Sequence, residues 1–305
     1  QIGYDDPDFA KNPEETNLRV LPEQIKKAKE IAGGNGMVAV NIMAVTQLYE
    51  TYVKTACAAG VDAIISGAGL PTELPKFAEG YNVALAPIVS STKSANVILK
   101  FWDKKYHRTA DFLVIEGPLA GGHLGFSKEQ LEDIPSLDYD TEIQNIIALK
   151  QTYEEKYQTT IPVFVAGGMF TAKDAAHVME LGADGIQAAT RFVATEECDA
   201  SDAYKQAYVN ASDEDVIIIK SPVGMPGRAI KNAFIERMLA APDKISHCFN
   251  CLKACNPATA PYCITQALIN AVVGDLDNGL IFCGSRVGEI TKITTVPKLM
   301  QELTV

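Results

Sequence analysis

Short apolar runs alternate with amphipathic segments along the first 190 residues. Each run is rich in Val, Ile and Ala, and most are continuously apolar instead of alternating with polar residues. Strands of this kind are buried on both faces, as in a parallel sheet covered by helices. The predicted strands are 37–42, 62–66, 83–89, 111–116, 161–166 and 184–189.

The amphipathic segments between these runs have helical spacing. The clearest are 22–34, 46–60 and 171–185. Pro22 is expected to open the first helix, and Thr46 and Thr171 to cap the other two. Gly60 and Gly182 are expected to end their helices, Gly182 in a left-handed conformation. The repeated strand–helix order predicts an α/β fold with right-handed crossovers.

Six such repeats do not close an eight-stranded barrel. The residues leave two architectures open: an open doubly wound sheet, or a (β/α)₈ barrel whose first two strands are absent from this sequence. After residue 190 the rhythm changes, which indicates an appended, mainly helical cap. Its expected parts are a helical stretch 191–214, a strand 215–221, a turn-rich 222–228, and helices near 229–241 and 262–273.

The composition of the chain excludes some classes of binding partner. The chain has 305 residues, 47% hydrophobic and 21% charged, with a formal net charge of −11. This acidic balance, without a basic block, argues against nucleic acid and anionic membranes as partners. No apolar run reaches the roughly 18 residues of a membrane span, and no signal peptide is visible. A cytoplasmic location is expected.

In parallel α/β folds, ligands bind at the carboxyl ends of the strands. In AGGMFT, Gly167 and Gly168 precede a helix and free their backbone N–H groups for an anion. The next strand ends in Ala188-Ala189-Thr190, where small residues leave room beside the backbone. The pair predicts a phosphate site; the alternative is a tight turn that binds nothing.

His123 lies in EGPLAGGHLG, after another strand. Its ordinary pKa lies near neutrality, so it suits acid–base work, although a loop histidine bonded to backbone is the commoner case. The other strand-end candidates are Asn41, Gly67, Lys93, Glu116, Gly121 and Gly122. Asn41 could instead be a buried, backbone-bonded residue, Lys93 a surface lysine and Glu116 an ordinary loop residue.

The segment HCFNCLKACNPATAPYC brings four of the seven cysteines together in sequence. Four thiolates this close suit zinc or an Fe–S cluster, and packed thiols or disulfides are the alternatives. The candidate metal ligands are Cys248, Cys251, Cys255 and Cys263, and His247 is adjacent.

The order of these motifs resembles the nitronate monooxygenase family, which includes FMN-dependent enoyl-acyl-carrier-protein reductases. The resemblance rests on Asn41, EGPLAGGHLG, PVFVAGGMF, GADGIQAATRF, SPVGMPGRAIKN and GLIFCGSRVGEI. It implies a TIM (β/α)₈ barrel that holds FMN, with 37–42 as the third strand and 184–189 as the eighth. The sequence would then lack the first two strands. Residues 1–190 would form the barrel, 191–278 the cap, and 279–305 a segment returning to the barrel.

The resemblance also implies roles for single residues. His123 falls on the family's catalytic histidine, and Asn41, Gly167, Gly168, Ala188, Ala189 and Thr190 fall on its flavin-binding positions. With Gly67, Lys93, Glu116, Gly121 and Gly122 these form the expected FMN-binding set.

Two chemistries follow from the resemblance. The leading one is oxidation of an alkyl nitronate with O₂; the alternative is reduction of an enoyl thioester with NAD(P)H. Outside the family, a non-redox barrel enzyme with a phosphate site and a non-catalytic binding protein stay open. The family also suggests a homodimer.

Overall fold

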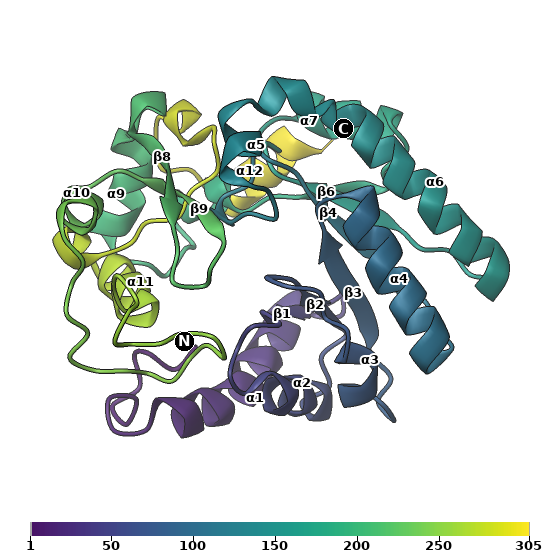
Figure 1. The fold of residues 1–305 in the computed structure, drawn as a ribbon, viewed down its shortest axis with the longest axis horizontal. Coiled ribbons are helices and arrows are strands. Elements are labelled where there is room, and N and C mark those ends of the chain that lie inside the picture. Colours follow the sequence, from purple (N-terminus) through teal and green to yellow (C-terminus); the bar gives the residue numbers. More distant parts are fainter. Residues whose placement is uncertain (1, 305) are drawn as a thin grey trace. The chain divides into compact units, whose positions relative to one another are not determined.

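The computed structural model describes residues 2–304, and the chain divides into two compact units (Figure 1). Unit 1 comprises 1–114, 148–162 and 249–253, and unit 2 comprises 115–147, 163–248 and 254–305. Both units combine parallel strands with helices, so the predicted α/β class is confirmed. Among residues 2–304, no helix has the length and apolar character that a membrane crossing requires.

Unit 1 contains three neighbouring parallel strands in the order β1-β2-β3. They are β1 (Ala39–Asn41), β2 (Ala63–Ser66) and β3 (Ala84–Val89). Ile64 and Leu85 are fully buried partners in adjacent strands. These strands fall inside three of the predicted runs, because continuous apolar runs suit a sheet buried on both faces.

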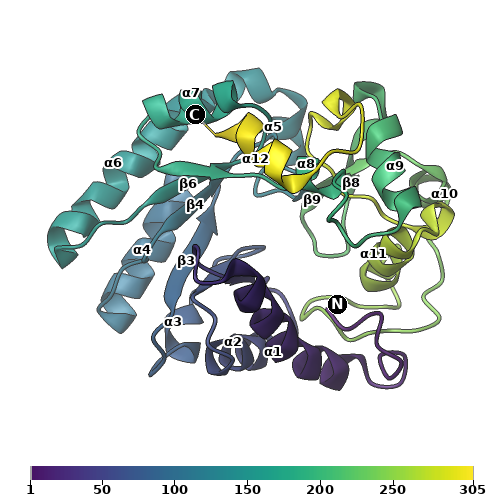
Figure 2. The ribbon, with the colours of Figure 1, turned by 180° about the vertical axis from the view of Figure 1, so that it is seen from behind.

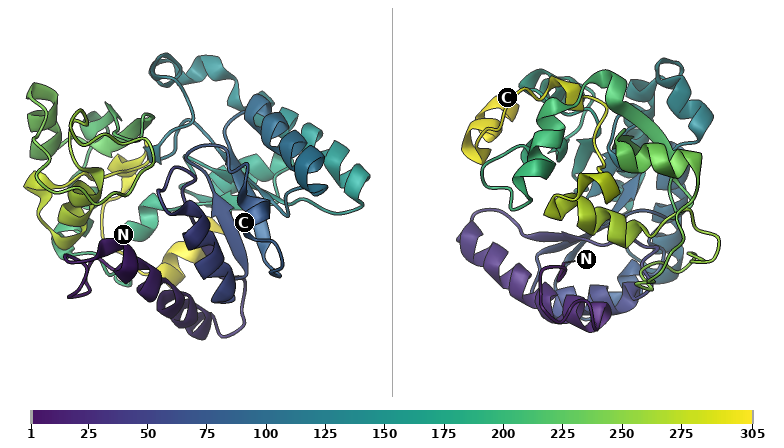
Figure 3. Two further views of the ribbon diagram at one scale, coloured as in Figure 1. Left: turned by 60° about the horizontal axis from the view of Figure 1, so that its bottom comes forward. Right: turned by 90° about the vertical axis from the view of Figure 1, so that its left-hand side faces the viewer.

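The helices of unit 1 pack around this sheet. They are α1 (Pro13–Ala32), α2 (Tyr49–Ala58), α3 (Leu74–Phe77) and α4 (Thr92–Tyr106). Figure 3 shows α1, in dark purple, beside α2. The prediction that Pro22 opens this helix is wrong, because Pro22 lies inside α1. The helix begins at Pro13, where the Asn12 side chain accepts from the Glu15 N–H.

The start of α2 also differs from the prediction. Thr46 is not its cap; the helix begins at Tyr49 without a side-chain cap. The reason is a tertiary contact within unit 1: Thr46 forms a β-bridge with Leu252, and the Gln47 N–H donates to the Cys251 carbonyl. Thr46 is held in this bridge between two turns, and the helix begins only after them. Gly60 follows the end of α2, as expected, and has a left-handed conformation with φ +76°.

Unit 2 contains the carboxyl ends of three parallel strands. The chain passes from unit 1 into unit 2 within β4 (Leu113–Glu116), and β6 (Val163–Ala166) pairs in parallel with β7 (Gly185–Gln187). The Gly117 N–H donates to the Ala166 carbonyl, so the ends of β4 and β6 lie together. These strands also fall inside predicted runs.

The helix after β6 forms as predicted. It is α7 (Ala172–Glu180), and Thr171 and Asp174 form a reciprocal capping box at its start. Such a box satisfies two backbone donors that the first turn leaves unpaired. Gly182 follows in the left-handed conformation, with φ +104°.

A small antiparallel sheet in unit 2 carries the histidine motif. Its order is β5-β9-β8, from β5 (Gly122–His123), β9 (Pro226–Ile230) and β8 (Val216–Lys220). The prediction of a strand at 215–221 is confirmed. The prediction of a turn over 222–228 is wrong for residues 226–228. These residues belong to β9, which begins at Pro226 and pairs with both other strands. Proline at the first strand position removes no ladder donor.

Further helices surround these sheets. They are α5 (Lys128–Glu132), α6 (Tyr139–Tyr157), α8 (Thr190–Val193), α9 (Asp202–Asn210), α10 (Ala233–Ala240), α11 (Ile264–Val273) and α12 (Val296–Leu303), with 3₁₀ turns at Ile134–Leu137, Asp213–Asp215, Leu276–Asn278 and Val287–Glu289. Figure 2 shows α12 beside α7 and α8 within unit 2. The predicted helical stretch 191–214 is thus two helices with a break between them.

Candidate functional site

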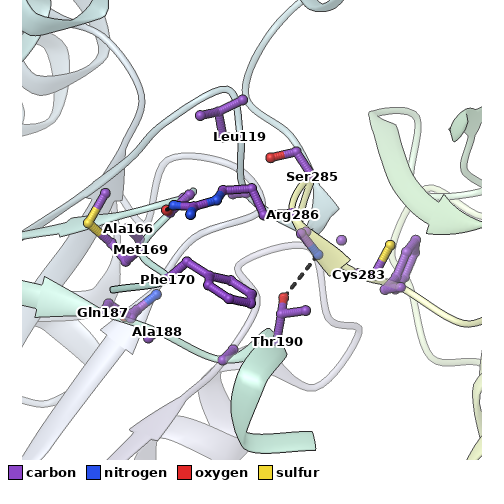
Figure 4. Close-up of a pocket in the computed structure, with 18 of the residues that line it drawn as sticks. Leu119, Ala166, Met169, Phe170, Gln187, Ala188, Thr190, Cys283, Ser285 and Arg286 are labelled. Atoms are coloured by element: carbon purple, nitrogen blue, oxygen red, sulfur yellow. Dashed lines mark hydrogen bonds between the residues drawn. The ribbon is translucent and has the colours of Figure 1, made fainter. Parts of the chain in front are cut away.

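A cavity of about 280 Å³ lies within unit 2, at the carboxyl ends of β4, β6 and β7 (Figure 4). The segment 282–286, which follows α11 in the chain, supplies part of its wall. The carboxyl ends of parallel strands are where α/β folds bind ligands. Its lining includes Glu116, Leu119, Gly121, Gly122, Gly167, Gly168, Met169, Phe170, Gln187, Ala188, Ala189, Thr190, Tyr208, Phe282, Cys283, Gly284, Ser285 and Arg286.

The glycines of the wall are required by close packing. Gly167 and Gly168 have φ of +94° and +79°, a region that L side chains rarely adopt. A Cβ on Gly167 would lie 2.9 Å from the backbone nitrogen of Ala120, and one on Gly121 would lie 2.5 Å from the carbonyl carbon of Cys283. The AGG turn, the AGGH loop and the 282–286 segment therefore meet backbone to backbone.

One end of the cavity presents hydrogen-bond donors without acceptors. Within residues 2–304, the backbone N–H groups of Gly168, Ala189 and Thr190 donate no hydrogen bond. The Ser285 hydroxyl is also buried without a partner there. Thr190 Oγ1 accepts from the Gly284 N–H at 2.9 Å, which ties the two walls together (Figure 4). The Ser285 hydroxyl is buried, and the three N–H groups belong to residues of the cavity wall, so a ligand that accepts hydrogen bonds can satisfy all four; a phosphate fits this set.

Two arginines lie near this end, and carboxylates neutralise both. Their guanidinium carbons lie 4.8 Å from the ring centroid of Phe170. Arg191 pairs with Glu302, and Arg286 pairs with Asp174 at 2.7 Å and with Glu289. Figure 4 shows Arg286 reaching over Phe170.

Asp174 connects the helix cap to Arg286. Burial alone would raise the pKa of its carboxyl, but hydrogen bonds from Thr171 and Arg286 outweigh burial and lower that pKa. Arg286 Nη1 also donates to the Gly168 carbonyl at 3.1 Å. The Gly168 backbone, whose N–H faces the proposed anion, is thereby fixed from behind.

Glu116 is a half-buried carboxyl in the cavity wall. Burial raises its pKa from 4.5 to about 7. The Tyr139 hydroxyl donates to its backbone carbonyl at 3.0 Å. At neutral pH this side chain can therefore donate or accept a hydrogen bond.

His123 lies in β5, adjacent to the cavity and outside its lining. Its Nε2 lies 2.8 Å from the Ser221 hydroxyl, and its ring meets the Phe282 ring edge-on at 5.0 Å. Burial lowers its pKa from 6.5 to about 4. At neutral pH the ring is uncharged, so one nitrogen can accept a proton while the other donates a hydrogen bond.

The structure brings together eight of the predicted site residues. Those in the cavity wall are Glu116, Gly121, Gly122, Gly167, Gly168, Ala188, Ala189 and Thr190. The other three lie in unit 1: Asn41 ends β1, Gly67 follows β2, and Lys93 lies in the first turn of α4. Their roles stay predictions.

The predicted metal site gains no support. Among residues 2–304, no group of three or more His, Cys, Asp or Glu side chains is placed to hold a metal ion. Cys251 belongs to unit 1, whereas Cys248, Cys255 and Cys263 belong to unit 2.

Sequence reasoning missed several residues of the wall. Ser285 and Arg286 belong to GLIFCGSRVGEI, a segment that we noted only as a family resemblance. Phe170 directly follows the AGGM turn, and Tyr208 lies in α9. Only the motif GSR carried a usable signal, since glycine followed by serine and arginine is suited to holding an anion.

Comparisons with known proteins identify the family of the chain. The family model for nitronate monooxygenase matches residues 9–305. A probable nitronate monooxygenase of Staphylococcus saprophyticus is 32% identical over 44% of this chain and 36% of its own length, and one of Staphylococcus aureus is 30% identical over 42% and 34%. The matched segments thus span about a third of those relatives.

Solved structures give a likeness over more of the chain. FabK from Thermotoga maritima has a TM-score of 0.69 at 25% identity, covering 92% of this chain and 80% of FabK. A nitroalkane oxidase from Streptomyces ansochromogenes has a TM-score of 0.65 at 18% identity, covering 94% and 84%. The second likeness supports the fold alone.

Proposed function

Because the chain belongs to the nitronate monooxygenase family, we propose that it is an FMN-dependent oxidoreductase that oxidises alkyl nitronates with O₂. The observation that carries the proposal is the set of unpaired donors at one end of the cavity. Three backbone N–H groups and a buried hydroxyl suit the phosphate of FMN, and the cavity at the strand ends suits the rest of the cofactor.

Different residues of the chain would bind different parts of FMN. The N–H groups of Gly168, Ala189 and Thr190 and the Ser285 hydroxyl would hold the phosphate. Glu116 and Gln187 line the cavity beyond this end, and their side chains would bond the hydroxyls of the cofactor. Asn41, Gly67 and Lys93 are the remaining residues of the FMN-binding set that the family resemblance implies.

Bound FMN supplies the redox chemistry, and the protein positions the substrate and moves protons. We assign the catalytic role to His123. Its ring is neutral at physiological pH because burial lowers its pKa to about 4. A neutral imidazole can donate a hydrogen bond to a substrate oxygen, or accept a proton, from the nitrogen that Ser221 does not engage.

The alternative within the family is reduction of an enoyl thioester with NAD(P)H. A solved enoyl reductase domain of MlnA from Bacillus amyloliquefaciens shares the fold at a TM-score of 0.60 and 13% identity. That likeness concerns the fold alone and leaves the substrate open. Non-redox catalysis at the phosphate site and binding without catalysis are the remaining alternatives, and both predict a colourless protein.

The first experiment is a visible spectrum of the purified protein, followed by identification of any flavin released on heating. We expect one FMN per chain. Failure to bind added FMN would refute the proposal. A Ser285→Ala variant should bind FMN more weakly by about tenfold, because it removes one phosphate donor.

Turnover assays then separate the two family chemistries. We expect O₂ uptake with ethyl nitronate, and no NADH oxidation with crotonyl thioester. His123→Ala should lose turnover and keep the flavin, with exposed His177→Ala as the matched control. If His123→Ala instead releases the flavin, His123 has a structural role.

A further inference from the structure

Arg228 is more deeply buried than Arg191 and Arg286, and among residues 2–304 no carboxylate balances its charge. Its residue is 3% exposed, whereas the side chains of Arg191 and Arg286 are 16% and 28% exposed. Arg191 and Arg286 each pair with acidic side chains. No salt bridge joins Arg228 to any acidic residue among residues 2–304.

Arg228 is connected to the wall of the cavity by three contacts. It lies in β9 opposite Gly122 of β5. Its Nη1 donates to the Ala120 carbonyl, and its backbone carbonyl accepts from the Cys283 N–H at 3.2 Å. Ala120, Gly122 and Cys283 line the cavity, so Arg228 lies directly behind this wall.

Among residues 2–304, Cys283 is the titratable side chain that interacts electrostatically with Arg228. Burial raises the pKa of its thiol to about 12, so the thiol is neutral at physiological pH. A guanidinium stays protonated in proteins. A buried positive charge therefore stands beside the AGGH loop without a counter-ion in the described chain.

Burying an uncompensated charge is unfavourable, and it becomes favourable when a ligand brings the opposite charge. We propose that Arg228 determines specificity for an anionic substrate, a small planar oxyanion such as a nitronate, by supplying the balancing charge from behind the Ala120–Gly122 wall. The inference rests on the proposed function. It also favours a nitronate over an enoyl thioester as the substrate, because an enoyl thioester is neutral at its reacting end and would leave the charge of Arg228 unbalanced.

The charge lies at a different place from the phosphate donors. Those donors belong to Gly168, Ala189, Thr190 and Ser285, whereas Arg228 contacts the loop that carries His123. The proposed anion therefore binds near His123, where the reacting group of a substrate is expected.

The test uses the flavin-loaded protein and two probes of similar size. Nitrate is a planar, unreactive oxyanion, and nitroethane is a neutral nitro compound. Each is titrated anaerobically, and binding is followed by the change in the flavin spectrum. The variants are Arg228→Gln, which removes the charge, and Arg228→Lys, which keeps it. Arg237→Gln, an exposed arginine of α10, is the matched control.

We expect wild type to bind nitrate more tightly than nitroethane. In Arg228→Gln the dissociation constant of nitrate should rise by about tenfold or more, with nitroethane binding unchanged. Arg228→Lys should restore most of the nitrate affinity, and Arg237→Gln should match wild type.

Several outcomes would overturn the proposal. One is a wild type that binds nitrate no more tightly than nitroethane, a result that needs no variant. Another is an Arg228→Gln variant that leaves nitrate binding unchanged, or weakens both probes equally, which would indicate loss of shape and not of charge. If Arg228→Gln releases the flavin while Arg228→Lys keeps it, the charge balances the cofactor instead. Failure of wild type to bind FMN is visible before any probe is added, and contradicts the proposed function itself.

Discussion

Replacing Glu116 by glutamine should make the stability of the flavin-free protein rise between about pH 5 and pH 7 relative to wild type. Replacing His123 by asparagine should have the opposite effect. Both expectations follow from two half-buried groups beside one cavity whose pKa values are displaced in opposite directions. In wild type the two contributions oppose each other.

The His123 contribution comes from a lowered pKa. Burial lowers it from 6.5 to about 4, so the unfolded chain binds more protons than the folded one across that window. Folding is then weakened as the pH falls from 6.5 toward 4. With these two values, the contribution of His123 is about 2 kcal/mol less favourable at pH 5 than at pH 7.

The Glu116 contribution has the other sign. Burial raises its pKa from 4.5 to about 7, so the folded chain binds more protons than the unfolded one. Its stabilising effect is full below pH 4.5 and is lost as the pH rises through 7. Between pH 5 and pH 7 this loss is also about 2 kcal/mol, which nearly cancels the gain from His123.

Urea unfolding at several pH values measures the effect, with the difference between variant and wild type as the observable. Groups shared by both proteins cancel in that difference. We expect the Glu116→Gln difference to change by about +2 kcal/mol from pH 5 to pH 7 and the His123→Asn difference by about −2 kcal/mol. His177→Asn, at an exposed site, is the control. If both differences are constant across this pH range, burial does not shift the pKa values of Glu116 and His123 as we infer.

Three further predictions concern the wall of the cavity. Gly121→Ala should destabilise the fold by about 2 kcal/mol in thermal unfolding, because its Cβ would lie 2.5 Å from the backbone of Cys283; an unchanged midpoint would contradict this. Tyr208→Phe removes a 2.5 Å hydrogen bond to the Phe282 carbonyl and should cost about 1–3 kcal/mol in urea unfolding, and a neutral result would mean that the carbonyl finds another donor. Asp174→Asn should weaken FMN binding by about tenfold in a fluorescence titration, since it loosens Arg286 behind the phosphate site, and equal affinity would disprove that link.

The strands and the glycine turns could be predicted because their signals are local. Continuous apolar runs located β1 through β4, β6 and β7, and paired glycines marked the turn that carries Gly167 and Gly168. Thr171 could be recognised as a cap because Asp174 follows three residues later. Each inference needs only a few neighbouring residues.

The misses came from contacts between distant parts of the chain. Thr46 is a residue type that often caps helices, but in the structure it pairs with Leu252 in an isolated bridge, three residues before the helix begins. β9 was taken for a turn because its strand character depends on pairing with β5 and β8. The cysteine spacing suggested a metal site, and only the three-dimensional path of the chain shows that no ligand set forms among the described residues.

The histidine loop shows why the site could be only partly predicted. Its own residues indicate flexibility: Gly121 and Gly122 precede His123, and Gly122 has φ +70°. The structure holds this loop through three long-range contacts, from Arg228 to the Ala120 carbonyl, from Ser221 to the imidazole, and from Cys283 against Gly121.

All three anchors come from residues about a hundred or more positions further along the chain. A glycine-rich loop loses much backbone entropy on ordering, so each anchor contributes to fixing the direction of the imidazole. One of these anchors is a buried guanidinium, which donates to Ala120 in the same loop as His123. Arg228 thus contributes both a contact to the loop and the charge of its surroundings, and removing that charge in Arg228→Gln should weaken the binding of anions while leaving the neutral probe unaffected.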